Sequence, residues 1–209
     1  MLSWKEQQTL ETYNKIAAGW AEKRNPNFWR SEFKLFGSLL PTGKIIDIGC
    51  GSGKDAALFV QGGYTYTGID FSEEMLMIAM KKMPLTKFLL MSMYSLEFPP
   101  CSFDGFWASA SLLHIPKENI ATVLHQIRKV VRPGGIGFFS LKKGVGEQIV
   151  QGSSHEDKRF FAFYERQEFI DVLTKNGFEI IAHGEKQEPP DPIKNPNPDI
   201  WLSYFVRRL

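Results

Sequence analysis

Cysteine, net charge and long apolar runs are all scarce in this sequence, and each shortage excludes a class of protein. The 209 residues include only two cysteines, Cys50 and Cys101, too few for a disulfide framework or a zinc site. The formal net charge of +2 creates no field that would draw the chain onto nucleic acid. No run is long and apolar enough to span a membrane, and the first residues lack the apolar stretch of a signal peptide. We therefore expect a cytoplasmic protein that binds neither membranes nor nucleic acid.

Apolar and aromatic residues, by contrast, are plentiful. Apolar types make up 43% of the chain and charged types 23%, the balance of a globular protein with a substantial core. A chain of this length can bury most of its apolar surface without disulfide or metal cross-links. The aromatic share is 13%, with 17 Phe and 5 Trp. This excess suggests that some aromatic side chains line a ligand pocket.

Short apolar runs alternate with segments of helical periodicity in the middle of the chain. The runs have the length and composition of buried strands and cover residues 44–48, 64–69, 88–91, 103–108 and 136–141. The predicted helices between them cover residues 54–61, 72–83 and 117–130, and a turn at 132–135 leads into the fifth strand. Alternating strands and helices with short links predict an α/β fold, a doubly wound, mostly parallel Rossmann-like sheet with helices on both faces.

The two ends of the chain complete this prediction. Residues 4–23 have the periodicity of an amphipathic helix, and a second short helix ends before Pro41, so residues 1–40 are predicted to form a helical cap. The cap is expected to form one compact unit with a cofactor-binding domain at 41–209. Residues 142–163 show no clear pattern, and the prolines of 189–198 predict a stiff, extended connection. A helix at 166–176 and strands at 178–183 and 200–207 are also predicted.

The most informative segment is Asp47-Ile48-Gly49-Cys50-Gly51-Ser52-Gly53, between the first strand and its helix. Glycines at alternate positions let the backbone turn sharply and approach a ligand closely. The segment fails as a phosphate-binding P-loop, because Asp55 follows Gly53-Lys54 where a Ser or Thr is needed. A dinucleotide fingerprint matches residues 51–56 by letter, but Gly49-Cys50 then intervenes between strand and fingerprint.

Two acids at strand ends narrow the choice of ligand. Asp47 would repel a pyrophosphate and suits a ligand that carries an amine or hydroxyl groups. The alternative interpretation is that Asp47 caps the following loop. Asp70, at the end of the second strand, suits the two hydroxyls of a ribose, which NAD also contains.

Four motifs in register resemble those of the class I S-adenosylmethionine-dependent methyltransferases that act on small molecules. Residues 45–53 resemble the glycine motif, 68–72 the end of the second strand, 102–108 the fourth-strand motif and 131–135 the following turn. The resemblance covers about residues 40–142, and Tyr13–Trp20 is similar to the helix that closes over the cofactor. It implies a seven-stranded sheet whose last strand is antiparallel, S-adenosylmethionine as cofactor and S-adenosylhomocysteine as product.

The resemblance implies cofactor contacts in the glycine turn, at three strand ends and in the first helix: Asp47, Gly49, Cys50, Gly51, Gly53, Asp70, Phe71, Met75, Ser92, Met93, Ala108, Tyr13, Trp20 and Arg24. Ser92 is a departure, because the family usually has an acid there to accept the adenine amino group. We expect looser adenine recognition, a loss of roughly 1–2 kcal/mol unless a nearby acid such as Glu97 compensates.

Several of these assignments have structural alternatives. Phe71 and Met75 suit the core as well as an adenine site, and the first-helix residues suit packing as well as a lid. His114, after the fourth strand, is either a general base for the acceptor or a structural hydrogen-bonding residue. Residues 160–164 either line an acceptor pocket or fill the core.

The predicted function is methyl transfer to a small-molecule acceptor at oxygen, nitrogen or carbon. Residues 98–101 contain a Pro-Pro pair but lack the preceding Asn or Asp found in many methyltransferases of nucleic acids and proteins. Two alternatives are an NAD(P)-dependent oxidoreductase on the same type of sheet and a non-catalytic S-adenosylmethionine-binding protein. We expect the protein to be a monomer or a homodimer. We expect no metal site.

Overall fold

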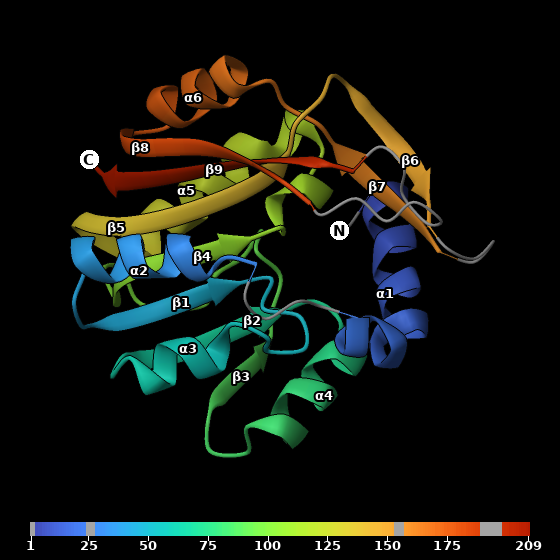
Figure 1. The fold of residues 1–209 in the computed structure, drawn as a ribbon, viewed down its shortest axis with the longest axis horizontal. Helices are drawn as coiled ribbons and strands as arrows, with labels where there is room; N and C mark the ends of the chain where they lie inside the picture. Colours follow the sequence, from blue (N-terminus) through green and yellow to red (C-terminus); the bar gives the residue numbers. More distant parts are fainter. Residues whose placement is uncertain (1–2, 24–27, 153–156, 189–197) are drawn as a thin grey trace.

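A seven-stranded sheet forms the centre of the protein in a computed structural model that describes residues 3–23, 28–152, 157–188 and 198–209 (Figure 1). Its strands are β1 Lys44–Ile48, β2 Thr65–Asp70, β3 Lys87–Leu90, β4 Phe103–Ser109, β5 Val131–Lys142, β8 Phe178–Gln187 and β9 Ile200–Arg208. They lie in the order β3-β2-β1-β4-β5-β9-β8, and β9 alone runs antiparallel to its neighbours. The predicted Rossmann-like sheet, with its last strand antiparallel, is confirmed.

Helices cover both faces of this sheet. They are α2 Arg30–Leu39, α3 Ala56–Gln61, α4 Glu73–Lys82, α5 Ile120–Val130 and α6 Arg166–Lys175. Ser72 caps α4 as predicted, because its hydroxyl accepts a hydrogen bond from the Met75 backbone at 3.2 Å. The described residues include no helix long and apolar enough to cross a membrane.

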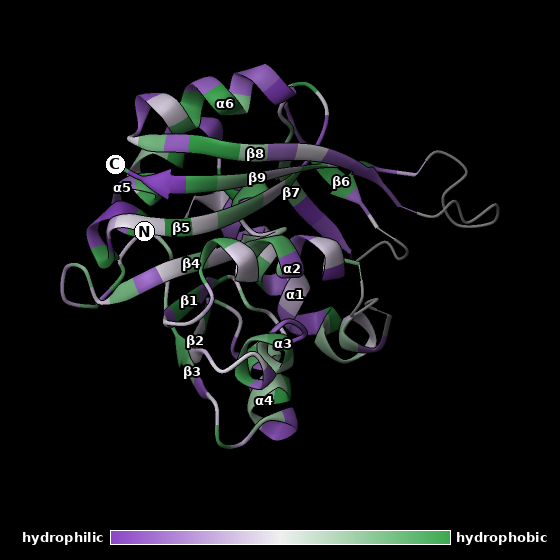
Figure 2. Cartoon of the chain, turned by 60° about the vertical axis from the view of Figure 1, so that its left-hand side comes forward, coloured by the Kyte–Doolittle hydropathy of each residue, from purple (hydrophilic) through white to green (hydrophobic). Residues whose placement is uncertain are grey.

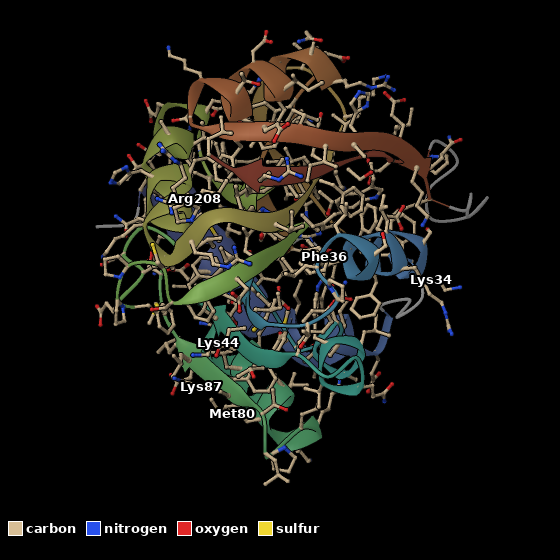
Figure 3. All side chains as sticks on the ribbon, turned by 90° about the vertical axis from the view of Figure 1, so that its left-hand side faces the viewer. Lys34, Phe36, Lys44, Met80, Lys87 and Arg208 are labelled. Atoms are coloured by element: carbon tan, nitrogen blue, oxygen red, sulfur yellow. The ribbon has the colours of Figure 1, made fainter. Side chains whose placement is uncertain are left out.

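Successive aromatic residues of β4 and β5 point to opposite faces, as the alternation of side chains along a strand requires. On one face the Trp107 ring stacks on Phe138 with centroids 3.9 Å apart, and Phe36 of α2 packs on Trp107. On the other face Phe106 contacts Phe139. Figure 3 shows Phe36 inside the molecule, whereas Lys34 on the same helix extends outward. Figure 2 colours the chain by hydropathy, and hydrophilic residues (purple) appear on the outer turns of α6, whereas β1 inside the sheet is mostly hydrophobic (green). Helix α2, although part of the predicted cap, therefore belongs to the packed core.

Helix α1, Trp4–Lys23, lies elsewhere, beyond the carboxyl ends of the central strands (Figure 1). It packs against α4 and against an antiparallel hairpin of β6 Glu147–Gln151 and β7 Lys158–Ala162, to which we refer as the β6–β7 hairpin. The Thr12 hydroxyl donates to the Lys158 carbonyl at 2.7 Å, and the Phe160 amide donates to the Thr9 hydroxyl at 3.0 Å. These contacts hold α1 across one end of the sheet.

Two expectations need correction. The β6–β7 hairpin occupies a segment in which the sequence pattern indicated no strand, because neighbouring residues Phe160 and Phe161 are both buried and the alternation is lost. The turn at 132–135 is a bulge inside β5, since Val131 pairs with Phe103 and Ile136 with Gly105. Most of the proline-rich segment, 189–197, lies outside the described residues.

Candidate active site

One cavity of about 960 Å³, counted to its open mouth, lies where α1 crosses the carboxyl ends of the strands. Ligands of open α/β sheets bind at this end, where the direction of chain winding changes between β1 and β4. Ten of the predicted cofactor contacts line the cavity: Tyr13, Trp20, Gly49, Cys50, Gly51, Asp70, Phe71, Met75, Ser92 and Met93. Asp47, Gly53 and Ala108 do not line it, and Arg24 lies outside the described residues.

The glycine turn has the left-handed backbone that its composition predicts. Gly49 has φ 74°, and a Cβ atom there would lie 2.4 Å from the Cβ of Ser111. Gly51 has φ 53°, and a Cβ atom there would have no neighbour within 4 Å. The bare backbone of Gly51 therefore faces free space in the cavity, as a cradle for a closely bound ligand does.

Asp70 is fixed by the turn that it faces. One carboxylate oxygen accepts the Gly51 amide at 2.7 Å, and the other accepts the Ser72 amide at 2.9 Å. Burial raises the pKa of Asp70 to about 6, although these amides favour the ionised form and lower it. Each oxygen has a second lone pair, so the carboxylate can still accept two hydroxyl donors.

Cofactor affinity should therefore depend on pH through Asp70. Protonation below about pH 6 removes the charge that accepts the hydroxyls, so the dissociation constant for S-adenosylhomocysteine should rise by up to about tenfold per pH unit below that value. Above about pH 7 it should be constant. Calorimetric titrations between pH 5 and 8 measure this profile. Asp70→Asn should bind more weakly with a flat profile, and a flat profile in the unaltered protein would contradict the assignment.

Asp47 is buried inside the sheet and is not among the residues that line the cavity, although the sequence predicts a ligand contact there. Its carboxyl accepts a hydrogen bond from the Tyr66 hydroxyl at 2.6 Å, a partner that the sequence did not suggest. Burial and the nearby Asp55 carboxylate raise the pKa of Asp47 to about 8, although the Tyr66 hydrogen bond lowers it. Asp47 is therefore largely protonated in the folded protein at neutral pH.

This raised pKa implies that Asp47 makes the fold less stable as pH increases. The unfolded chain loses the proton near the ordinary pKa of 3.8, whereas the folded chain keeps it to about 8, so stability falls between these values. Asp47→Asn resembles the protonated acid, and it should increase the free energy of unfolding by at least ~1 kcal/mol near pH 7.5. The gain should vanish near about pH 4. Denaturant unfolding curves of both proteins at pH 7.5 and pH 4 measure the difference in free energy of unfolding. A variant that is less stable than the unaltered protein at pH 7.5 would refute the prediction.

His114 lies between α1 and the β6–β7 hairpin. Its Nδ1 is 2.7 Å from the Phe160 carbonyl oxygen, and its Nε2 is 2.8 Å from the Tyr13 hydroxyl. A carbonyl only accepts, so Nδ1 carries the proton, and Nε2 of the neutral ring accepts a hydrogen bond from Tyr13. The structural hydrogen bond that the sequence suggested is therefore present, and the role of His114 as a general base stays a prediction.

A second recess of about 490 Å³ adjoins the main cavity and shares Tyr13, Trp20 and His114 with it. Its wall includes Phe161, whereas Phe160 and Tyr164 are buried and do not line it. The predicted aromatic cluster at 160–164 therefore divides between the recess and the core.

Four buried side-chain oxygens around the main cavity have no hydrogen-bond partner in the protein, namely Glu6 Oε1, Tyr94 Oη, Ser109 Oγ and Ser111 Oγ. Unsatisfied buried polar atoms are costly, and their gathering around one cavity fits a ligand rich in polar groups. None of the four residues was predicted. The two serines could have been predicted from their position just after the fourth strand. Strand β4 extends one residue beyond the predicted boundary, so Ser109, Ala110 and Ser111 line the cavity in place of Ala108.

A glycine turn after β1, an acid at the end of β2 and a helix across the strand ends are features of Rossmann-like enzymes that hold a nucleoside-bearing cofactor. Residues 45–135 match the family model described as a methyltransferase domain. The matched residues run from β1 into β5, and the sheet as a whole has the same fold as a solved S-adenosylmethionine-dependent methyltransferase.

The chain is also similar to curated methyltransferases. It is 29% identical to the ubiquinone biosynthesis O-methyltransferase of Paracidovorax citrulli, over 83% of this chain and 77% of that protein. It is 30% identical to the malonyl-[acyl-carrier protein] O-methyltransferase of Erwinia pyrifoliae, over 46% of this chain and 36% of that protein. For several such relatives the chain spans only 36% to 66% of their length.

Among solved structures, the fold is similar to the 1,6-didemethyltoxoflavin-N1-methyltransferase of Burkholderia thailandensis. That comparison has a TM-score of 0.76 and 18% identity, over 100% of this chain and 92% of the other. A methyltransferase structure from Methanosarcina mazei gives a TM-score of 0.74 at 20% identity, over 84% and 97% of the two chains. Both similarities show the shared fold.

Proposed function

We propose that this protein transfers the methyl group of S-adenosylmethionine to a small-molecule acceptor. The observation that carries the proposal is the pairing of Asp70 with the bare backbone of Gly51 at the wall of one cavity. The Burkholderia neighbour was solved with S-adenosylhomocysteine and its substrate, which supports the same use of the fold here.

The cavity residues have distinct roles in this proposal. Asp70 accepts the ribose hydroxyls, Phe71 and Met75 flank the adenine, and the backbone of Met93 faces the edge of the base. Ser109 and Ser111 supply hydroxyls without partners in the protein, which suit the polar methionine end of the cofactor. Helix α1, which lies across the cavity, excludes water and places Tyr13 beside the acceptor.

Bound S-adenosylmethionine supplies a methyl group that is electrophilic because of its sulfonium, so the protein needs mainly to align the acceptor and remove its proton. Tyr13 donates to His114 Nε2, and it can take a proton from the acceptor as it gives its own to the ring. The Phe160 carbonyl fixes the ring so that Nε2 faces Tyr13. His114 is thus the proposed base, and Tyr13 carries the proton to it.

The second recess is the proposed acceptor site. Its wall combines Trp20, Phe161 and Trp201 with two cations that each pair with an acid, and Glu188 of the wall accepts a hydrogen bond from Trp201 at 2.9 Å. Lys142 pairs with Asp199 at 2.5 Å, and Arg159 pairs with Asp157 at 2.8 Å. A wall of aromatic rings and paired cations suits a small and partly apolar acceptor better than a nucleic acid. The recess is formed within one chain, so the proposal is compatible with either a monomer or a homodimer.

Incubation with methyl-labelled S-adenosylmethionine and panels of small phenols, carboxylic acids and amines tests the proposal. Label should appear in one class of acceptor, together with S-adenosylhomocysteine. Tight binding of S-adenosylhomocysteine without transfer to any panel would support a non-catalytic binding protein instead.

A further inference from the structure

The position at which the family usually has an adenine-binding acid holds Ser92. Its hydroxyl accepts the Tyr94 amide at 3.2 Å, so it stabilises the loop after β3. Glu97, the acid that the sequence offers as a substitute, is exposed and does not line the cavity. No carboxylate of this loop therefore faces the place where the adenine amino group should lie.

A carboxylate does reach the same cavity from α1. Glu6 lines it together with Ser92 and Met93, and its side chain is 4% exposed. Oε2 of Glu6 accepts the Ser3 amide at 2.8 Å and the Ser3 hydroxyl at 2.7 Å, which closes a capping box at the start of α1. Oε1 is buried and has no hydrogen-bond partner in the protein.

A capping box uses only one oxygen and ordinarily lies on the surface, so capping alone does not explain a buried carboxylate with an unused oxygen. Burial and the interaction with the Glu6 carboxylate raise the pKa of Tyr94, so the Tyr94 hydroxyl lies near this carboxylate, although the two form no hydrogen bond of ordinary geometry. The two hydrogen bonds from Ser3 also hold the carboxylate in one orientation, so little side-chain freedom remains to be lost when a ligand binds.

We propose that Glu6 of α1 accepts a hydrogen bond from the exocyclic amino group of the cofactor's adenine, in place of the acid missing at Ser92. The inference rests on the proposed function. An amino group offers the donor that Oε1 lacks, and the charged acceptor gives a stronger bond than the Ser92 hydroxyl could. Because Glu6 belongs to the helix that covers the cavity, recognition of the base depends on α1 being in place.

The test compares S-adenosylhomocysteine with S-inosylhomocysteine, in which a carbonyl oxygen replaces the amino group. Calorimetry should show that the unaltered protein prefers the adenine ligand by at least about tenfold. In Glu6→Gln the amide oxygen keeps the cap while the amide nitrogen faces the base. This nitrogen repels an amino group and can donate to the carbonyl, so the preference should fall at least about fivefold.

Ser3→Ala is the matched control, because it weakens the same cap and leaves the carboxylate. It should keep the preference. Equal weakening of both ligands in Glu6→Gln would overturn the inference and leave Glu6 as a helix cap. Failure of the unaltered protein to bind either ligand would instead overturn the proposed function.

A second variant guards against a general loss of binding. Adding Ser92→Asp to Glu6→Gln places a carboxylate at the usual family position, and it should return the preference for S-adenosylhomocysteine. A double variant that binds both ligands equally would contradict the assignment of this end of the cavity to adenine.

Discussion

Asp70→Ala should weaken the binding of S-adenosylhomocysteine at least tenfold. The substitution removes the two charge-assisted hydrogen bonds that we propose for the ribose, each worth ~1.5–3 kcal/mol, from a buried site. It also frees the amides of Gly51 and Ser72, which the carboxylate now holds at 2.7 Å and 2.9 Å, so the glycine turn loses its anchor as well. Isothermal calorimetry measures the dissociation constant directly.

Asp104→Ala is the matched control for this experiment. Asp104 is an acid near the start of β4, where it accepts hydrogen bonds from the Lys44 amide and the Arg132 guanidinium, away from the cavity. Its loss should lower stability slightly and leave the dissociation constant unchanged. An unchanged constant in Asp70→Ala would refute the ribose role, and a large change in Asp104→Ala would show that the assay measures folding instead.

His114→Ala should lower kcat by about 10²–10⁴ for any acceptor that must lose a proton, the usual range for a general base. Tyr13→Phe should have a comparable effect, because the phenol connects the acceptor to Nε2. His114→Ala should bind S-adenosylhomocysteine within a few-fold of the unaltered protein, since His114 is not among the predicted cofactor contacts, and Tyr13→Phe keeps the aromatic ring at the cavity wall.

The pH profile of the rate distinguishes this role from a structural one. Loss of His114 as base should remove the acidic limb of the profile, whereas simple loosening would lower the rate equally at every pH. His125→Ala, on the exposed face of α5, is the control and should leave the rate unchanged. An unaltered rate in His114→Ala would exclude His114 as the base.

The fold was predictable because its local signals agree with one another. The apolar run of β1, the glycines after it and the cap at Ser72 each indicate the same βα arrangement, and the structure confirms them. The β6–β7 hairpin was not predictable, because α1 buries neighbouring residues that would otherwise alternate. Tertiary contacts there override the period on which strand prediction depends.

In the candidate site, too, some residues could be predicted from local sequence and others depend on tertiary packing. Its glycine turn and Asp70 follow directly from strand ends, where the direction of each side chain is nearly determined. Asp47 has the expected sequence position, but its environment depends on Tyr66, nineteen residues further along the chain. Glu6 resembles an ordinary capping residue in sequence, and only the packing of α1 over the cavity suggests the second role that we propose for it.

Parallel calorimetric titrations with S-adenosylhomocysteine and with NADH test the central claim most directly. Both ligands contain adenosine, but NADH carries a pyrophosphate, whose charge the carboxylates of Asp70 and Glu6 at the cavity wall disfavour. The account predicts saturable one-to-one binding of S-adenosylhomocysteine, lost in Asp70→Ala, and no measurable heat of binding with NADH. Tight binding of NADH without binding of S-adenosylhomocysteine would contradict it.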